Sequence, residues 1–440
     1  MTFAGRNALA FGLILAATAN MGLASEPDVP VALSWTSPDA LDLGFDEKEL
    51  GALLDSYVQD VRDGKLPGAN LMISRRGQAV LRASIGFADR EDRAALSFDH
   101  LFRLYSMTKP IAAVLALQQI EAGLYGLDTA VGTFLPEFSE PLVFDPETGP
   151  RKSRSRMTVQ HLLTHTAGFT AVWNDDAVAR IYEEHGVIEH FPNEYENTPS
   201  SLSDFYRRIR ALPLLHDPGT RRTYGVSNDV QGVLAERAGG SDVASILRSR
   251  LFDPLGMRET SFCVSGQDLA RFASLYTYDE VGNLSRVEGG EQTAYECPAA
   301  LNSLSGGLVG TISDYWRFAE ALRRGGAYGE ARILSPESVE LLFAPQPNVD
   351  EGDAWIPGAE WGLSIAIVVE PSKSERTEVR NNVYWSGAAN TSFWIDPSNE
   401  LVALIFTQVR GSHPEFSIQT DFRNRVYSAF RGAKGGQKRF

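Results

Sequence analysis

The chain has 440 residues, of which 43% are hydrophobic and 22% are charged. This composition is ordinary for a globular protein and excludes disorder, collagen and coiled coil as descriptions of the whole chain. Lysine and arginine number 41 and aspartate and glutamate number 56, so the net charge is −15. This balance argues against a nucleic-acid-binding protein, because such proteins present a basic face.

Residues 1–24 have the pattern of a secretory signal peptide. One positive charge, Arg6, precedes an apolar run that is too short to cross a bilayer. Two small-residue cleavage patterns follow, Ala17-Thr18-Ala19 and Gly22-Leu23-Ala24. We expect cleavage after Ala24 and therefore an exported protein, periplasmic or secreted, with an N-terminal extension over residues 25–43. A cytosolic chain with an apolar N-terminal helix is the alternative. No membrane anchor is predicted, because no later segment has the roughly 18 apolar residues that a span needs.

Residues 46–62 predict an amphipathic helix, because apolar side chains recur at spacings of three and four residues along this segment. Asp46 can cap its start and Gly64 can end it. Residues 69–86 predict a hairpin that turns at Arg76-Gly77.

Residues 111–117 are apolar at every position, which predicts a helix buried on all sides. Residues 135–290 carry helix and loop signals with little strand signal. Strand patterns return later in the chain, at residues 362–369, 391–396 and 401–409, and are followed by a helix at 416–430.

Strands at both ends of the chain predict one antiparallel sheet flanked by helices, an α/β fold of the α+β type. Its domain would combine residues 44–134 and 291–432. A mostly helical domain of residues 135–290 would be inserted between them, and residues 433–440 would form a mobile tail.

The two cysteines, Cys263 and Cys297, lie 34 positions apart. In an exported protein they can form a disulfide that closes a loop-rich stretch, and two unrelated buried thiols are the alternative. His161 and His165 have a spacing that can hold zinc on a helix, but Leu162 stands where the HExxH motif has glutamate. No metal site is therefore predicted.

The clearest chemical pattern is Ser106-Met107-Thr108-Lys109 at the start of the buried helix. Residues three apart share a helix face, so the lysine amine can reach the serine hydroxyl. The positive end of the helix dipole favours a developing oxyanion at the serine. Desolvation beside an apolar helix is expected to lower the lysine pKa, so that the amine can act as a base.

Other stretches add to this pattern, in order along the chain: FRLYSMTKPI (102–111), LDTAVGTFLPEF (127–138), MTVQHLLTHTAGF (157–169), PGTRRTYGVSNDVQG (218–232), LFDPLGMRETSF (251–262), GGLVGTISDYWRFAEAL (306–322) and WSGAANTSFWIDP (385–397). With these stretches the chain resembles the serine β-lactamase and penicillin-binding-protein superfamily. The resemblance is to its class C-like branch and is closest to family VIII carboxylesterases. It implies a β-lactamase/DD-peptidase-like fold, which agrees with the organisation inferred above.

The resemblance also implies roles for individual residues. Ser106 would be the nucleophile, Lys109 its partner base, and Tyr224 the residue that relays a proton to the leaving group. The backbone N–H groups of Ser106 and Ala388 would form the oxyanion hole.

The third motif, Trp385-Ser386-Gly387, would lie beside the nucleophile and bind substrate. Two positions depart from class C β-lactamases: Val226 replaces an asparagine that binds the substrate amide, and Trp385 replaces a lysine that attracts the β-lactam carboxylate. Both departures favour esters, and Trp385 with Tyr105 is expected to wall an apolar acyl pocket.

We therefore expect a serine hydrolase that cleaves short-chain esters through an acyl-enzyme, without a metal or organic cofactor. Its partner would be a small-molecule ester or a β-lactam-like compound. A β-lactamase or D-amino-acid peptidase is the alternative. An acyltransferase or a non-catalytic penicillin-binding sensor comes third.

Overall fold

The computed structural model describes residues 29–33, 40–188, 197–289, 293–346, 357–374 and 376–432. The predicted signal peptide, the predicted tail and part of the predicted N-terminal extension lie outside these residues. No helix among the described residues is long and apolar enough to cross a membrane.

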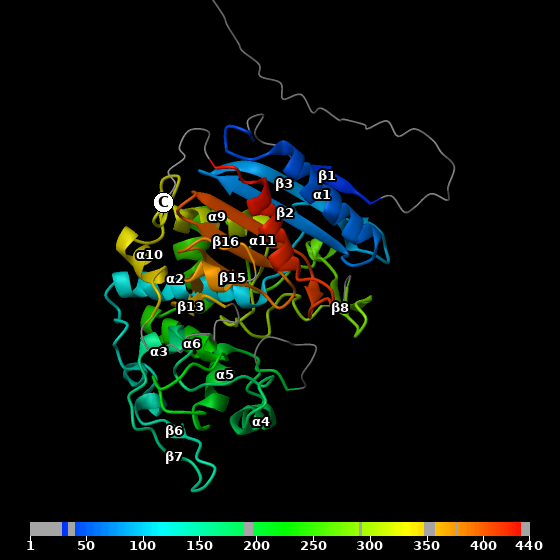
Figure 1. Ribbon diagram of the computed structural model, residues 1–440. Helices are drawn as coiled ribbons and strands as arrows, with labels where there is room; N and C mark the ends of the chain where they lie inside the picture. The colour runs from blue at the N-terminus through cyan, green and yellow to red at the C-terminus, as the bar shows by residue number, and fades with distance from the viewer. Residues whose placement is uncertain are drawn as a thin grey trace, which may run out of the picture.

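A nine-stranded antiparallel sheet organises one half of the molecule (Figure 1). Its strand order is β1-β3-β2-β17-β16-β15-β14-β13, with β4 paired to β3. The strands are β1 (Val31–Leu33), β2 (Gly68–Arg75), β3 (Gln78–Asp89), β4 (Ala94–Ala95), β13 (Ala359–Trp361), β14 (Ala366–Val368), β15 (Val383–Ser386), β16 (Ser392–Asp396) and β17 (Leu401–Phe406). Strand β2 pairs with β17 in a register that sets Arg75 opposite Leu401, which confirms a sheet built from both ends of the chain.

Helices cover both faces of this sheet (Figure 1). One face carries α1 (Glu47–Arg62) and α11 (Ile418–Ala429), which pack against each other, and the other carries α9 (Ile312–Arg323). Helix α1 begins where predicted, because the Asp46 side chain accepts hydrogen bonds from the backbone N–H groups of Lys48 and Glu49. The predicted hairpin is also confirmed: β2 and β3 turn at Arg76 and Gly77, which have φ of 54° and 76°.

Helix α2 (Thr108–Glu121) is the predicted buried helix. Every residue from Ile111 to Leu117 has an exposed fraction of 0%. The helix packs against α6 (Ser227–Gly239) of the middle segment, so it joins the two halves of the molecule.

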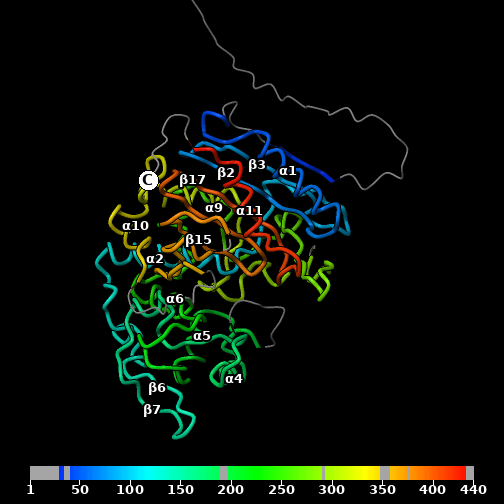
Figure 2. The backbone as a smooth tube through the Cα atoms, in the orientation of Figure 1, coloured from blue at the N-terminus to red at the C-terminus, as the bar shows by residue number. Residues whose placement is uncertain are grey.

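Helices α4 (Ala177–Glu184), α5 (Leu202–Ile209) and α6 lie together away from the sheet, drawn in green (Figure 2). The other helices of the middle segment are α3 (Val159–Leu163), α7 (Val243–Leu247) and α8 (Asp253–Leu255), with shorter turns η2 (Val131–Thr133), η3 (Pro136–Ser139), η4 (Arg248–Phe252) and η5 (Leu269–Arg271). Helix α8 contacts α9, beside the sheet. Two short strands, β6 (Leu142–Val143) and β7 (Arg151–Lys152), pair with each other.

Two features differ from the expected strands. Strands β8 (Leu275–Tyr278) and β9 (Leu284–Glu288) form where little strand signal was expected, and β8 pairs in parallel with β18 (Val409–Arg410). The strand expected at residues 362–369 is interrupted by a turn between β13 and β14. Ser364 has a φ of 55° there, and its N–H donates to Leu163 O at 2.7 Å.

The remaining short elements connect these layers. They are β5 (Phe102–Arg103) with β10 (Val309–Gly310), β11 (Ala327–Tyr328) with β12 (Ala331–Arg332), η1 (Tyr105–Met107), α10 (Pro336–Leu342) and η6 (Pro371–Lys373).

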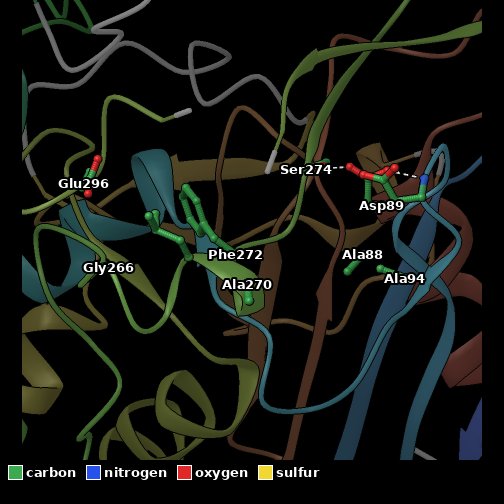
Figure 3. Close-up of a pocket in the computed structure, with 10 residues that line it drawn as sticks. Ala88, Asp89, Ala94, Gly266, Ala270, Phe272, Ser274 and Glu296 are labelled. Atoms are coloured by element: carbon green, nitrogen blue, oxygen red, sulfur yellow. Dashed lines mark hydrogen bonds between the residues drawn. The ribbon is translucent and has the colours of Figure 1, made fainter. Parts of the chain in front are cut away.

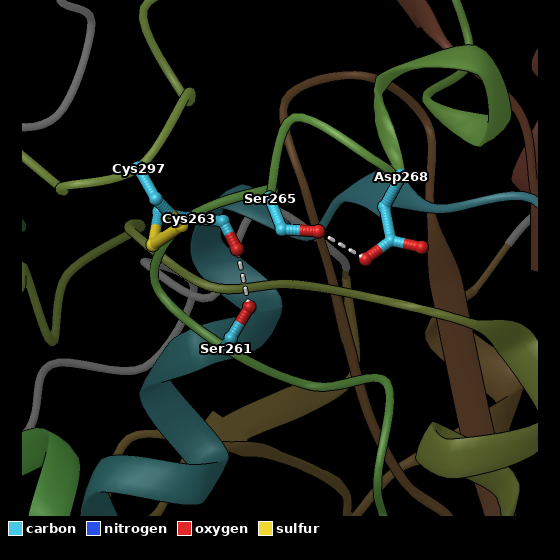
Figure 4. The surroundings of a disulfide bond; sticks show 5 residues. All are labelled: Ser261, Cys263, Ser265, Asp268 and Cys297. Atoms are coloured by element: carbon cyan, nitrogen blue, oxygen red, sulfur yellow. Dashed lines mark hydrogen bonds between the residues drawn. A yellow bond between two sulfur atoms is a disulfide. The ribbon is translucent and has the colours of Figure 1, made fainter.

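Cys263 and Cys297 are joined in a disulfide (Figure 4). The backbone beside it is also tied, since Cys297 N–H donates to Val264 O at 3.0 Å. The segment that leads into the disulfide pairs Ser261 with Val309 of β10, and β10 pairs with β5. The segment next to the disulfide is therefore linked through β10 to β5, the short strand that lies shortly before Ser106.

Candidate active site

Ser106 lies in η1, the turn between β5 and α2. The backbone is held on both sides of it: Leu104 N–H donates to Leu308 O at 2.9 Å, and Tyr315 Oη donates to Met107 O at 2.9 Å. Tyr105 has a φ of 46°, a left-handed conformation that costs energy for a bulky side chain. These contacts hold the strained turn that presents the serine.

Lys109 is fully buried one helical turn after Ser106. Its side-chain nitrogen Nζ lies 3.3 Å from Ser106 Oγ and donates to Ser305 O at 2.7 Å. The same nitrogen lies 4.5 Å from the centre of the Tyr224 ring. The lysine therefore touches both the serine and the tyrosine of the predicted motifs.

Asp229 on α6 orders the turn that supplies the lysine's carbonyl partner. Its Oδ1 accepts from Ser303 Oγ at 2.7 Å and from the Ser305 N–H at 3.2 Å. Burial raises the pKa of Asp229, while the hydrogen bonds from Ser303 and Ser305 and the charge of Lys109 act in the opposite direction. The carboxyl group thus links α6 to the position of Lys109.

Tyr224 lies in an extended segment just before α6, and the backbone of this segment is fixed by the loop after α3. Thr223 N–H donates to His165 O at 2.9 Å, and Tyr224 O accepts from Asn174 Nδ2 at 3.1 Å. Gly225 contacts the same loop so closely that a Cβ there would lie 2.4 Å from Thr170 O. Only glycine permits this approach.

Aromatic rings surround the phenol of Tyr224. The His165 ring lies 4.5 Å away between centres, the Trp385 ring 5.9 Å and the Trp361 ring 6.0 Å. Trp361 and Trp385 contact each other edge to face at 4.4 Å. The proton-relay candidate therefore lies in an apolar, aromatic environment.

The third motif ends strand β15 beside the nucleophile. At Gly387 a Cβ would lie 2.3 Å from Leu104 O, so glycine is required for the strand end to reach the turn that carries Ser106. Ala388 follows and is exposed, next to the serine in the same cleft. The arrangement brings the backbone of Ser106 and that of Ala388 to one surface.

The cleft at Ser106 has a volume of about 280 Å³. It is lined by Ser106, Trp173, Tyr224, Trp385, Ser386, Gly387 and Ala388. None of these described lining residues carries a charge. The walls are aromatic, and the floor near the serine has small side chains, a combination that suits an uncharged acyl group.

Two residues expected to bind substrate lie elsewhere. Tyr105 is 4% exposed and packs with Leu275 and Ala389, away from the lining of the cleft. Val226 is fully buried at the start of α6 and belongs to the main core. Both side chains are held by packing, so of the two residues expected to wall an acyl pocket, Tyr105 and Trp385, only Trp385 is among the residues that line this cleft.

Three residues of the site were missed in the sequence. Trp173 lines the cleft from the loop between α3 and α4, and nothing in its local pattern indicates this. Asp229 and His165 stand within motifs that the sequence does contain, but their contacts with Ser305 and Tyr224 join segments that are far apart in the chain.

A larger hollow, of about 490 Å³, lies away from the nucleophile (Figure 3). Its most prominent polar group, Asp89, is already bound to Ser274 and Arg286. Burial by itself would raise the Asp89 pKa, but hydrogen bonds from Ser274, Asp92 and Arg286 outweigh it and lower the pKa. This carboxylate serves an ion pair of the fold, so we assign the chemistry to the smaller cleft at Ser106.

The chain is similar to known proteins over most of its length. A family model described as Beta-lactamase matches residues 54–427. Esterase EstB of Burkholderia gladioli is 28% identical over 419 residues, which cover 90% of this chain and 100% of that protein. Lovastatin esterase of Penicillium rubens is 30% identical over 423 residues, covering 87% of this chain and 100% of the esterase.

The fold also has close counterparts among solved structures. EstCE1, described as a hydrolase with promiscuous acyltransferase activity, superposes with a TM-score of 0.75 at 24% identity. The superposition covers 87% of this chain and 99% of EstCE1. The likeness establishes the shared fold over nearly the whole of both chains.

Proposed function

Because the chain belongs to the β-lactamase family and is a serine hydrolase, we propose that it is a carboxylesterase that acts on short, uncharged esters through an acyl-enzyme on Ser106. The observation that carries this proposal is the contact of Lys109 Nζ with Ser106 Oγ, at 3.3 Å, in a cleft without charged lining. The esterase names of EstB and lovastatin esterase support an ester as the substrate.

In the acylation step, Ser106 Oγ attacks the ester carbonyl carbon and its proton passes to Lys109 in the neutral form. The carbonyl oxygen becomes an oxyanion, which the backbone N–H groups of Ser106 and Ala388 stabilise. The carbon–oxygen bond to the alcohol breaks, and the proton reaches that oxygen through the Tyr224 hydroxyl. The alcohol leaves and the acyl group stays on the serine.

Deacylation repeats these steps with water as the nucleophile. Tyr224 and Lys109 take a proton from the water, whose oxygen attacks the acyl carbon, and return a proton to Ser106 Oγ as the carboxylic acid leaves. When an alcohol takes the place of water, the same step makes a new ester, so hydrolysis and acyl transfer compete for one intermediate.

The cleft favours esters over β-lactams for an electrostatic reason. Trp385 stands where the class C-like pattern has a lysine, and it is 3% exposed within an aromatic cluster. A β-lactam carboxylate would therefore be desolvated there without a cation from this position, which is unfavourable. A neutral acyl ester carries no such group.

Parallel initial rates on p-nitrophenyl butyrate and nitrocefin test the proposal. We expect rapid ester cleavage with little nitrocefin turnover, and a loss of at least about 1000-fold in Ser106→Ala. Ser265→Ala is the matched control, because its hydroxyl bonds Asp268 outside the cleft. Dominant nitrocefin turnover would identify a β-lactamase instead, and substantial activity in Ser106→Ala would exclude this nucleophile.

We also propose that the protein is exported. The signal-like pattern of residues 1–24 and the Cys263–Cys297 disulfide support this, since disulfides persist mainly in oxidising compartments. Fractionation of cells that produce the full chain, with mass determination of the mature N-terminus, tests it. A product in the cytosolic fraction that retains residues 1–24 would contradict export.

A further inference from the structure

His165 follows α3 and contacts the backbone on both sides of Tyr224. Its carbonyl oxygen accepts from Thr223 N–H at 2.9 Å, and its ring nitrogen Nδ1 accepts from Gly225 N–H at 3.4 Å. One residue thus holds the residues immediately before and after the phenol. To do so it adopts a φ of 55°, which is uncommon for a residue other than glycine.

The ring of His165 also supports the phenol itself. The two ring centres are 4.5 Å apart with planes inclined by 32°, and His165 is fully buried. Trp361 of β13 contacts the histidine ring from another direction, at 5.6 Å between centres. The imidazole is therefore enclosed between the proton-relay candidate and the edge of the sheet.

We propose that His165 is a positioning residue for Tyr224, and that it acts as a neutral imidazole with its proton on Nε2. The tautomer follows from the contact with Gly225: a nitrogen that accepts a hydrogen bond from a backbone N–H must present its lone pair. A second proton, on Nδ1, would oppose the Gly225 N–H and open this contact. The inference concerns how the proposed esterase holds its tyrosine and rests on that function.

The surroundings of the ring favour the neutral form. The charged groups that face it are Lys109 of α2 and Arg222 of the segment before Tyr224, and Asn228 of α6 adds a polar contact. Burial is the largest cause that lowers the His165 pKa well below its ordinary value. The charge of Arg222 acts in the same direction, as does that of Lys109 whenever its amine is protonated, and Asn228 acts in the opposite direction. The imidazole therefore keeps its contact with Gly225 through the neutral pH range.

Two substitutions distinguish the contribution of the His165 ring, which packs on Tyr224, from that of its Nδ1, which accepts from Gly225 N–H. His165→Phe keeps an aromatic ring against Tyr224 but removes the acceptor for Gly225 N–H. His165→Asn keeps an acceptor and tolerates a positive φ, but removes the ring. His161→Asn is the matched control, because His161 lies one turn earlier and accepts from Thr158 N–H at the start of α3, outside the cleft.

Steady-state kinetics with p-nitrophenyl butyrate provide the first measurement. We expect His165→Phe to lower kcat by about 100-fold with little change in KM, because a small displacement of a catalytic group has an effect of this size. His165→Asn should lie between this variant and the wild type. His161→Asn should retain kcat even if its unfolding temperature falls.

The labelling rate of Ser106 by a fluorophosphonate probe separates this inference from the proposed function. Absence of labelling in the wild type would count against the serine hydrolase. Labelling that is rapid in the wild type and equally rapid in both His165 variants would overturn only the positioning role. A decrease of kcat in His161→Asn as large as in His165→Phe would also overturn it, since the effect would then reflect general damage to α3.

The tautomer has a readout that needs no substrate. In nitrogen-15 NMR of the histidine-labelled protein, the signals absent from His165→Asn belong to His165. We expect them to show a neutral ring protonated at Nε2 even at about pH 6, below the ordinary histidine pKa of about 6.5. A ring protonated at Nδ1, or doubly protonated at that pH, would overturn the assignment.

Discussion

Trp173 is the only large exposed side chain among the described residues that line the cleft at Ser106. It is 42% exposed and lies in the loop that also supplies Asn174 to the Tyr224 backbone. Its ring thus forms one wall of the cleft, while the neighbouring Asn174 holds the backbone of Tyr224. An apolar group of the substrate that enters here would be shielded from water by this ring.

Truncation of this ring tests its contribution. We expect Trp173→Ala to lower kcat/KM for p-nitrophenyl butyrate by about tenfold, which corresponds to about 1.4 kcal/mol of lost contact. The effect should be smaller for p-nitrophenyl acetate, whose acyl group has less apolar surface. Equal losses for the two esters would show that Trp173 does not contact the acyl group, and urea unfolding of the variant checks that the fold is kept.

At the scale of elements, the turn before Tyr224 is fastened by an ion pair. Arg151 of β7 donates to both carboxylate oxygens of Asp217, at 3.0 and 2.7 Å. The Arg154 N–H adds a bond of 2.8 Å, and the Asp217 side chain is only 11% exposed. The hydrogen bonds from Arg151 lower the pKa of Asp217, against the effect of burial.

We expect Asp217→Asn to lower the free energy of unfolding by about 2 kcal/mol at neutral pH, because hydrogen bonds to a charged group are lost. Since the folded-state pKa is depressed, this contribution is present above the ordinary aspartate pKa of about 3.9 and is lost as the pH falls through the lowered value. Urea unfolding at about pH 7 and pH 3 should therefore show a smaller difference between the two proteins at pH 3, although the difference does not vanish there, because pH 3 lies below the ordinary pKa and above the lowered one. Asp175→Asn is the control, since Asp175 is 95% exposed in its pair with Arg180 and should contribute little. Equal losses from both substitutions would refute the argument.

The elements that sequence could predict are those whose pattern is local. The helix Glu47–Arg62 and the hairpin at Arg76-Gly77 follow from periodicity, a cap and turn residues. Strands β8 and β9 were not predicted, and the parallel pairing of β8 with β18 joins segments from different parts of the chain. The break at Ser364 likewise depends on Leu163, a distant residue.

The contacts of the site also fall into those that local spacing predicts and those that it does not. Ser106 and Lys109 are one helical turn apart, so their contact is implied by spacing alone. The burial of Tyr105 and the contacts of His165 with Tyr224 depend on how the chain packs, which no local pattern contains.

The disulfide acts at the level of a whole loop. Cys263 and Cys297 are separated by 34 positions. Closing a loop of this length lowers the conformational entropy of the unfolded chain, which stabilises the folded protein by about 4 kcal/mol. We expect Cys263→Ser, Cys297→Ser and the double variant to lose similar free energies of unfolding, and dithiothreitol to destabilise the wild type but not the double variant. Identical urea midpoints for wild type and double variant would show that the bridge contributes nothing.

At the scale of the whole molecule, the sheet depends on strands from the two ends of the chain. Strand β17 lies between β2 and β16, so a segment near the C-terminus completes a core begun by the N-terminal hairpin. Leu404 on β17 is fully buried, while Leu33 on the edge strand β1 is 46% exposed. The same residue type thus occupies the centre and the margin of one sheet.

Replacing each leucine by alanine measures how much each side chain contributes to the stability of the sheet. We expect Leu404→Ala to lower the free energy of unfolding by about 3 kcal/mol, because it removes buried methyl groups and leaves a cavity in the core beside β17. Leu33→Ala should change it by less than about 0.5 kcal/mol, since its side chain already meets water. Urea unfolding followed by tryptophan fluorescence, with ester hydrolysis assayed along the transition, would also show whether activity is lost together with the sheet. Gly387, at the end of β15, lies directly against the backbone of Leu104, so we expect the site and the sheet to unfold together. Loss of activity well before unfolding in Leu404→Ala would contradict this and would mean that the site opens independently of the sheet.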